Sequence, residues 1–280
     1  MVVRAGDSGE PVKSVQRGLN KLGAMLLVDG QYGRSTRDAV ATARARLGCP
    51  GPADEVDDAL QAAIAAVPEP FPPLTAAGVT FIARAEVSDA VTYRTKFQTP
   101  CVPPKPSGVT IGIGYDCAFV TPSELRADWQ ETLPAGSIDR LIPVCGKEGS
   151  EDLRELVKDV VIPLDAAMTV FARRSLVRFV DRTRGIYPQI DTLPPARRTA
   201  LVSLVYNRGT RLTDREPARQ ERREMRAIRD LLAAGAHDGV AAQFESMTRL
   251  WDPARAPGLI VRRRQEAKLW QEGFAALQLE

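Results

Sequence analysis

Hydrophobic residues recur at helical spacing over most of this 280-residue chain. Within residues 4–67 they fall three and four positions apart in three successive segments, each bounded by glycine, proline or aspartate. This pattern predicts three short helices. From residue 74 onward the same spacing predicts further helices near residues 75–86, 122–131, 150–158, 163–181, 195–207, 218–234, 238–249 and 258–274.

Two segments between residues 86 and 122 depart from the helical pattern. Residues Val91–Phe97 alternate apolar and polar side chains, which predicts a strand. Residues Gly108–Tyr115 are predicted to be its partner strand, reached through a proline-rich loop. One small sheet followed by many helices predicts an α+β fold that is mostly helical. At Thr121, a threonine followed by proline and, three positions on, by Glu124 predicts a capped helix start.

A proline-rich segment, Pro68–Pro73, separates the first three helices from the rest of the chain. Four of its six residues are proline, which favours an extended, semi-rigid spacer. The sequence therefore predicts a first domain over residues 1–67, a linker over 68–73 and a second domain over 74–280.

Composition narrows the classes of function. A hydrophobic content of 44% supports packed cores, and a net charge of +3 is far from the strongly basic character of nucleic-acid-binding proteins. No apolar run reaches the length of a membrane span, and the N-terminus lacks the apolar core of a signal peptide. We therefore expect no nucleic-acid partner, no membrane insertion and synthesis in the cytoplasm.

The cysteines and the single histidine do not form a recognisable metal pattern. Cys49, Cys101, Cys117 and Cys145 lack zinc-site spacing, and His237 has no ligand set near it in the sequence. We expect no metal and no cofactor. Reduced thiols are the favoured state. A pairing of Cys101 with Cys117 across a hairpin is the alternative.

The first domain carries two motif blocks. They read G-D-S-G-x-x-V-x-x-V-Q-x-x-L-x-x-L-G and V-D-G-Q-Y-G-x-x-T-x-x-A-V. In order and spacing they resemble the peptidoglycan-binding module, which implies a three-helix bundle that binds bacterial cell wall. Within the second block, Asp29, Gly30 and Gly33 are best explained by turn formation. The side chains expected to contact the wall are Gln31, Tyr32 and Arg34.

The second domain places acidic and hydroxyl groups around a glycine-rich segment. Glu86 ends a predicted helix, and the strand that follows carries Thr110 and Asp116. Their even separation puts both side chains on one face of an extended strand. Glycines within residues 108–114 would let a ligand approach the backbone. Two carboxyl groups at a cleft are the requirement of glycoside hydrolysis, so we interpret this region as a glycosidase site.

Four blocks of the second domain support a family resemblance. In order, they are a helix ending in Glu86, the segment T-I-G-I-G-Y, the helix Ala200–Gly209, and G-L-x-x-R-R-x-x-E from Gly258 to Glu266. They resemble the phage-type lysozymes, over about two hundred residues. The resemblance implies a lysozyme-like domain, preceded here by the three-helix bundle. It also implies cleavage of the β-1,4 bond between N-acetylmuramic acid and N-acetylglucosamine.

One departure points to a particular branch. Many phage lysozymes place the second carboxylate between the glutamate and the threonine, but here only Asp89 lies in that interval. The order Glu86, Thr110, Asp116 instead resembles the pesticin-like branch. By that resemblance Glu86 is the general acid, Asp116 the second carboxylate, and Thr110 helps Asp116 to hold the attacking water. A water held in this way implies inversion at the anomeric carbon.

Each assignment has a simpler alternative. Glu86 could be an exposed residue at a helix end, Asp116 a turn residue bonded to its own backbone, and Thr110 an ordinary strand former. Asp89, close to Glu86, competes for the role of second carboxylate. Further expected substrate contacts are Tyr115, Asn207, Arg208, Arg262 and Arg263. The last two are equally well explained as a solvated basic helix face.

The combined prediction is a monomeric endolysin, a muramidase whose partner is peptidoglycan. It would wait in the host cytoplasm and act in the periplasm or cell wall after a separate holin opens the membrane. A secreted antibacterial effector or bacteriocin with the same chemistry is one alternative. A cell-wall-binding protein without catalytic activity is another.

Overall fold

The computed structural model describes residues 2–71 and 73–277. The contacts divide the chain into two compact units. Unit 1 comprises residues 1–72 and 79–175, and unit 2 comprises residues 73–78 and 176–280. Helix α4 (Ala76–Val87) contributes its first turn to unit 2 and the remainder to unit 1.

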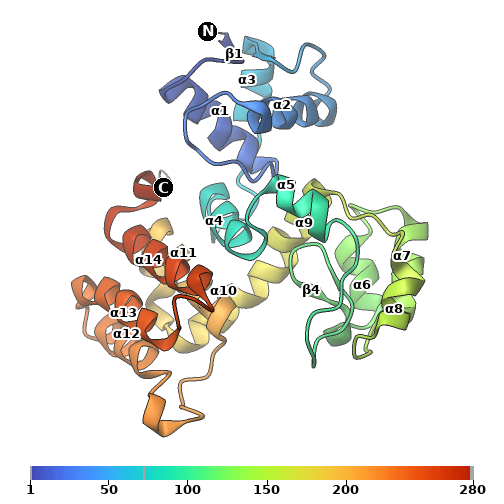
Figure 1. Cartoon of the computed structure of the whole chain (residues 1–280). Helices are drawn as coiled ribbons and strands as arrows, with labels where there is room; N and C mark the ends of the chain where they lie inside the picture. The colour runs from blue at the N-terminus through green and yellow to red at the C-terminus, as the bar shows by residue number, and fades with distance from the viewer. Residues whose placement is uncertain (1, 72, 278–280) are drawn as a thin grey trace. The chain divides into compact units, whose positions relative to one another are not determined.

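The N-terminal part of unit 1 has the three helices that the hydrophobic spacing predicts (Figure 1). They are α1 (Glu10–Lys21), α2 (Arg34–Leu47) and α3 (Asp58–Ala65). Two short antiparallel strands, β1 (Val3–Arg4) and β2 (Glu55–Val56), pair Val3 with Val56 and so bring the start of the chain to the segment before α3.

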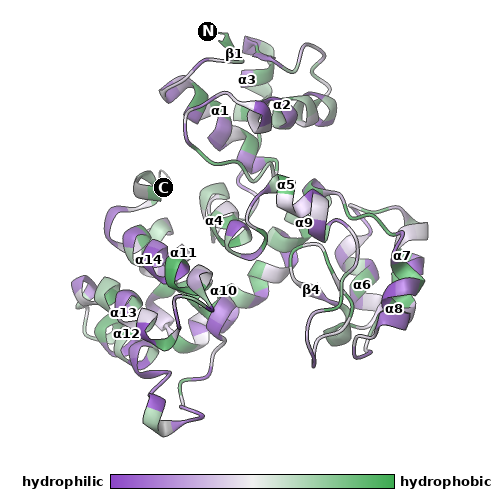
Figure 2. Cartoon of the chain, viewed as in Figure 1, coloured by the Kyte–Doolittle hydropathy of each residue, from purple (hydrophilic) through white to green (hydrophobic). Residues whose placement is uncertain are grey.

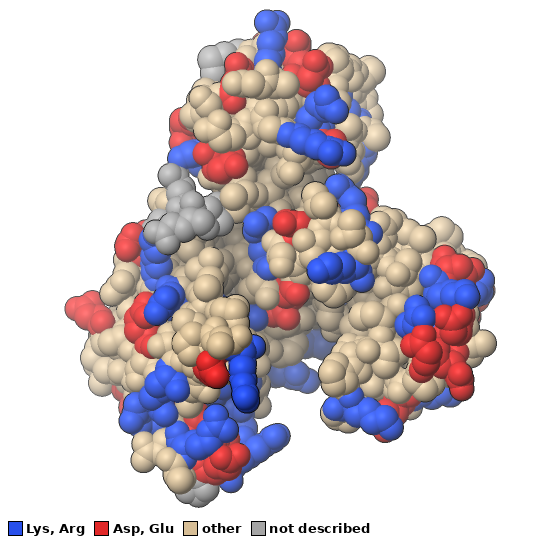
Figure 3. Space-filling model, viewed as in Figure 1, with Lys and Arg blue, Asp and Glu red and all other residues tan. Residues whose placement is uncertain are grey.

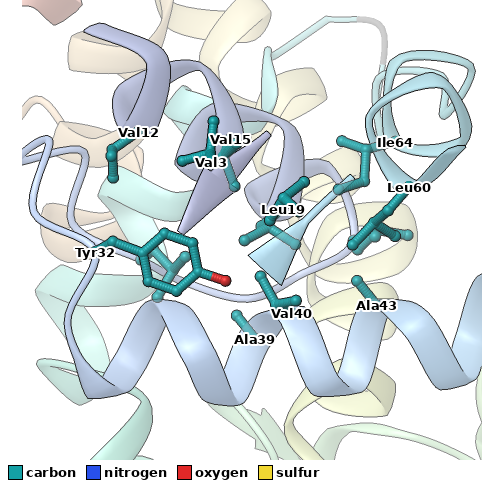
Figure 4. Close-up of a cluster of buried hydrophobic side chains, with 13 residues drawn as sticks. Val3, Val12, Val15, Leu19, Tyr32, Ala39, Val40, Ala43, Leu60 and Ile64 are labelled. Carbon is teal, nitrogen blue, oxygen red and sulfur yellow. The ribbon is translucent and has the colours of Figure 1, made fainter. Parts of the chain in front are cut away.

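This bundle has its own hydrophobic core (Figure 4). Leu19, Val40 and Leu60, one from each helix, are fully buried. A polar network fixes the turn before α2. The Gln16 amide nitrogen donates to Asp29 Oδ1 at 2.8 Å, and the Gln16 amide oxygen accepts from Gly30 N at 2.9 Å. Asp29 and Gly30 therefore shape the turn, as their sequence suggests.

Residues 79–175 of unit 1 form helices, connecting loops and one hairpin. Hairpin strands β3 (Thr110–Ile111) and β4 (Tyr115–Asp116) are followed at once by the 3₁₀ turn η2 (Cys117–Phe119). The helices are α5 (Ala90–Thr92), η1 (Tyr93–Phe97), α6 (Pro122–Trp129), α7 (Ala135–Leu141), η3 (Ile142–Val144), α8 (Glu151–Val157), α9 (Leu164–Val170) and η4 (Phe171–Ser175). The Thr121 capping box before α6 is confirmed, with both of its hydrogen bonds formed.

The strand predicted over residues 91–97 is wrong. This segment forms α5 and the π-helical turn η1. The side chain of Asp89 accepts a hydrogen bond from Thr92 N at 2.7 Å and so starts a helix where the alternating pattern favours a strand. Tyr93 is buried there, and its hydroxyl donates to the carbonyl of Ile162 at 3.0 Å. A local cap and one tertiary contact thus outweigh the pattern.

The predicted strand over residues 108–115 is also shorter than expected. Gly112 and Gly114 have φ angles of 58° and 67°, a backbone conformation that glycine adopts without strain. They fold the segment into a turn, so that β4 returns antiparallel to β3. On its other side, β3 meets Cys101 through an isolated bridge with Thr110.

Unit 2 contains helices and turns throughout its described part. Its elements are α10 (Leu176–Ile186), η5 (Pro188–Thr192), α11 (Pro195–Arg208), η6 (Pro217–Arg219), α12 (Arg223–Ala233), η7 (His237–Gly239), α13 (Val240–Ser246), η8 (Met247–Leu250), α14 (Pro257–Glu272) and η9 (Phe274–Leu277). Hydrophobic and hydrophilic residues are mixed along these helices (Figure 2), and basic and acidic side chains are interspersed on the surface (Figure 3).

The fold class predicted from the sequence is confirmed, because the protein is mostly helical with small two-stranded sheets. Among the described residues, none of the helices has both the length and the apolar character needed to cross a membrane. Residues 1–67 share unit 1 with residues 79–175, and Arg84 donates to the carbonyl of Met25 at 3.3 Å. The domain boundaries drawn from the sequence stay a prediction.

Candidate functional site

The hairpin brings two of the predicted catalytic residues directly opposite each other. Thr110 on β3 pairs with Asp116 on β4 in the antiparallel register. Side chains of directly paired residues lie on the same face of a sheet. The two residues therefore share a face across a turn, not along one strand as predicted. Both are partly exposed.

Backbone hydrogen bonds hold the carboxylate of Asp116 in place. Its Oδ1 atom accepts from Gly108 N and from Ala118 N, each at 2.9 Å, and thereby caps η2. This is the turn role that the sequence allows as an alternative. Its other oxygen, Oδ2, makes no hydrogen bond within the described part of the chain and is left for a water or a ligand. The carboxylate is anchored through one atom only.

Gly108 makes this anchoring possible because its surroundings leave no space for a side chain at this position. A Cβ atom there would lie 2.6 Å from Ala118 Cβ and 2.8 Å from the carbonyl oxygen of Lys147. The backbone of Gly108 therefore approaches η2 closely enough to donate to Asp116. The sequence marks Gly108 as a point of close approach, but not as a donor to the candidate carboxylate.

Glu86 lies near the end of α4, in the part of that helix that belongs to unit 1 with the hairpin. Its neighbours Ile82, Ala83 and Val87 are buried, whereas Glu86 itself is exposed. The helix thus packs one face into the core and presents the carboxyl group to solvent. A carboxyl in this position is accessible to a large substrate.

Asp89, the competing carboxylate, has a structural task. It caps α5 by accepting from Thr92 N, and this hydrogen bond lowers the pKa of the Asp89 carboxyl. Asp116 caps η2 in the same way, so capping alone does not distinguish the two aspartates. What sets Asp116 apart is its register opposite Thr110 on the hairpin, whereas Asp89 lies at the start of α5.

Tyr115 is part of the core, which argues against the predicted contact with substrate. Its side chain is buried, its hydroxyl donates to Asp128 Oδ2 at 3.0 Å, and its ring meets Trp129 edge-on at 5.4 Å between centroids. The alternation along β4 explains this placement, since Tyr115 and Asp116 point to opposite faces.

Arg262 and Arg263 on α14 do not form a solvated face, and their burial argues against the predicted contact with substrate. Both side chains are buried, at 4% and 0% exposure, together with Glu266 at 0%. Arg263 donates to Glu266 Oε1 at 2.7 Å. Ser203 Oγ, on α11, donates to the same oxygen at 2.6 Å and accepts from Arg262 Nε at 3.1 Å. We call these four residues the buried ionic cluster.

The buried ionic cluster carries two cations and one carboxylate, of which only Arg262 keeps a small exposed area. Burial raises the pKa of Glu266, while Arg263 and Arg262 oppose that rise because they stabilise its ionised form. The sequence contains a signal for this pairing, because Glu266 follows Arg263 by three positions and Arg262 by four. The sequence contains no comparable signal for the hydrogen bonds that Ser203 makes.

The other two expected contacts in unit 2 differ in accessibility. Asn207 is exposed near the end of α11. Arg208 stacks over Trp251, with 5.2 Å from its guanidinium carbon to the ring centroid, and donates to the carbonyl of Glu221. Burial, with Arg222 nearby, lowers the pKa of Arg208 to about 10. Arg208 therefore holds local structure, and Asn207 is the more available of the two.

In the three-helix bundle, Tyr32 is likewise a core residue. It is 4% exposed, and its hydroxyl donates to the carbonyl of Ala53 at 3.1 Å, so its predicted role in wall contact is not supported. Figure 4 shows its ring among the aliphatic side chains of the bundle. Gln31 and Arg34 are exposed and free to meet a ligand.

Comparison with known protein families bears on this bundle. Residues 8–54 match the family described as "Putative peptidoglycan binding domain". The chain contains a peptidoglycan-binding module. Peptidoglycan is therefore the partner of this module, as the resemblance of the two motif blocks implies. A search of curated proteins finds no match for the chain.

The cysteines contribute no cross-link. Cys49, Cys101, Cys117 and Cys145 are all free thiols, so the alternative pairing of Cys101 with Cys117 is not formed. Burial raises the pKa of the Cys117 thiol, which makes it a poor nucleophile. Across residues 2–71 and 73–277, no group of three or more His, Cys, Asp or Glu side chains is arranged to hold a metal ion.

Proposed function

We propose that this protein is a peptidoglycan hydrolase that cleaves the β-1,4 bond between N-acetylmuramic acid and N-acetylglucosamine. The observation that carries the proposal is the pairing of Thr110 with Asp116 across the hairpin, which puts a hydroxyl beside a carboxylate. Glu86 supplies an accessible carboxyl in the same unit. The peptidoglycan-binding module supplies the substrate class.

In this mechanism Glu86 protonates the leaving glycosidic oxygen. Asp116 takes a proton from a water that attacks the anomeric carbon from the opposite face, and Thr110 orients that water through its hydroxyl. Because Asp116 Oδ1 is occupied by two backbone N–H groups, the water would bind at Oδ2. The backbone donors also keep the carboxylate in one orientation, which lowers the cost of positioning the water.

The test is an analysis of purified peptidoglycan after digestion. We expect fragments with muramic acid at the reducing end, freed in the presence of the parent protein and absent with Glu86→Gln. An anhydro end would indicate a transglycosylase, and freed peptides would indicate cleavage of another bond. The amide cannot donate the acid's proton, so a folded Glu86→Gln protein with near-parent activity would contradict the mechanism.

A wall-binding protein without catalysis is the second candidate. The double hydrogen bond to Asp116 Oδ1 favours it, because this bond alone explains an aspartate at that position. A parent protein that sediments with peptidoglycan but releases no fragments would establish this candidate in place of the first.

For the biological setting we propose an endolysin that acts in the periplasm or cell wall after a holin opens the membrane. A secreted effector or bacteriocin with the same chemistry would instead be accompanied by an immunity protein. The gene neighbourhood separates the two. A holin gene beside the coding gene supports the endolysin, and an immunity gene there would contradict it.

A further inference from the structure

A pocket of about 220 Å³ lies within unit 1, outside the hairpin site. One wall comes from α1 and α2 of the peptidoglycan-binding module, through Leu19, Ala39 and Ala43, and from Leu22 just after α1. The opposite wall comes from α5, η1 and the start of α9, through Ala90, Arg94 and Leu164. The pocket therefore combines the module with residues that follow the candidate catalytic helix.

The wall from the module is made mainly of small or aliphatic side chains, with the hydroxyls of Ser35 and Thr42 as its polar groups. Ala39 presents a methyl group, and Leu19 and Ala43 belong to the core of the bundle. Such a wall accepts methyl-sized side chains and offers few hydrogen bonds to a sugar, whose hydroxyl groups would lose water without replacement.

The rim carries two charges that are available to a ligand. Arg94 is exposed and makes neither an ion pair nor a side-chain hydrogen bond within residues 2–71 and 73–277. Asp165 uses one carboxylate oxygen locally, accepting from Ala166 N at 3.0 Å. One cation and one anion at the edge of an apolar pocket complement a peptide end that has a carboxylate and an amine.

We propose that this pocket binds the peptide part of peptidoglycan, as a short segment with alanine-sized side chains and a free terminal carboxylate. The carboxylate would pair with Arg94, the methyl groups would rest against Ala39, and an amino group would face Asp165. At about 220 Å³ the pocket is smaller than sites for drug-sized ligands, which suits a peptide end better than a glycan strand.

This proposal rests on wall binding by the module and not on hydrolysis. A protein that binds the peptide but releases no wall fragments would leave the pocket assigned and remove the muramidase function. A protein that hydrolyses the wall but does not bind the peptide would support the muramidase function and remove the assignment of the pocket. The two proposals therefore fail separately.

The experiment is calorimetric titration of the full chain with N-acetyl-lysyl-D-alanyl-D-alanine. The same peptide with a C-terminal amide is the ligand control, because it differs only at the carboxylate. Arg94→Ala tests the cation, and Arg37→Ala, an exposed arginine of α2 that does not line the pocket, is its matched control. Thr42→Trp, at an exposed lining position of α2, tests the space.

We expect Kd for the acid peptide to rise about tenfold in Arg94→Ala and to stay at the parent value in Arg37→Ala, since a charge-assisted hydrogen bond is lost only in the first. The amide should bind the parent about tenfold more weakly, and Thr42→Trp should abolish binding. Equal effects of the two arginine changes, equal affinity for acid and amide, or no peptide binding by the parent would each overturn the proposal. Preferential binding of an N-acetylglucosamine tetramer would overturn it as well.

Discussion

The β3–β4 hairpin and the buried ionic cluster place ionisable groups in opposite environments, one partly exposed and one buried. In the hairpin, Asp116 is partly exposed and only neutral backbone N–H groups hold it. In the cluster, Arg263 and Glu266 are fully buried and hold each other. The first arrangement leaves a carboxylate oxygen open to water, and the second leaves no room for a substrate.

This difference shows that charged residues in a motif serve two separate purposes. A buried ion pair loses hydration when the protein folds, so its partners depend on each other for stability. An exposed carboxylate held by backbone donors loses little hydration and keeps its reactivity. At these two sites, burial separates the carboxylate that is open to water from the carboxylate that holds the core, although both belong to the same family resemblance.

The largest expected effect is on stability, at the buried ionic cluster. Arg263→Ala should lower the free energy of unfolding by about 3–5 kcal/mol, because Glu266 would remain buried without its main partner. Arg264→Ala, at the adjacent exposed position, should change it by less than about 0.5 kcal/mol. Urea unfolding followed by circular dichroism measures both. Similar values for the two variants would mean that the cluster is not what holds α14.

The next effect is on activity, at the hairpin. Asp116→Asn keeps an Oδ1 acceptor for Gly108 N and Ala118 N, so its unfolding free energy should match that of the parent. Its rate of wall hydrolysis should fall about 100-fold or more, because the amide cannot accept the proton of water. Asp116→Ala should also lose about 1 kcal/mol of stability with the cap. Full activity in Asp116→Asn would reduce Asp116 to its turn role.

A smaller effect is expected at Thr110. Thr110→Val keeps the branched shape that suits a strand but lacks the hydroxyl, and hydrolysis should fall about tenfold, the value of one hydrogen bond to the attacking water. Thr110→Ser keeps the hydroxyl and should stay within a few-fold of the parent. Turbidity decrease of permeabilised cells is the measurement. The assignment fails if Val and Ser are equally active.

The smallest effect is expected at Asp89. Its pKa is lowered in the folded protein, so its contribution to stability is complete above its unfolded pKa, about 3.9, and is lost as pH falls through the folded value. Asp89→Asn keeps the cap acceptor and should reduce the loss of stability below about pH 4, with wall hydrolysis unchanged near pH 7. A severe loss of hydrolysis in Asp89→Asn would mean that Asp89, and not Asp116, is the second carboxylate.

The sequence predicts the helices well because their signals are local. Apolar spacing marks α1 to α3, and the threonine, proline and glutamate at residues 121–124 are enough to start α6. Thr110 and Asp116 could also be placed together from the sequence, although the reason is a glycine turn between them and not one continuous strand. Local chemistry and short-range pairing are the part that a sequence specifies most directly.

The remainder depends on contacts between distant residues. The alternation at residues 91–97 favours a strand, but Tyr93 reaches a carbonyl 69 positions away, and that segment is helical. Likewise, the spacing of Arg263 and Glu266 predicts a pair, but it does not indicate the hydrogen bond that Glu266 accepts from Ser203, 63 positions earlier. Periodicity cannot reveal which side of a helix another helix will cover.

Gly108 has a consequence for anyone who would diversify this hairpin. Randomising the codon at position 108 and selecting for folded protein should return glycine alone, since even alanine would collide with Ala118 and Lys147. Gly114, exposed and at a φ of 67°, should instead tolerate asparagine, which enters this backbone conformation more readily than other side chains. A designer seeking new specificity would therefore keep glycine at residue 108 and randomise the residues at the hairpin tip.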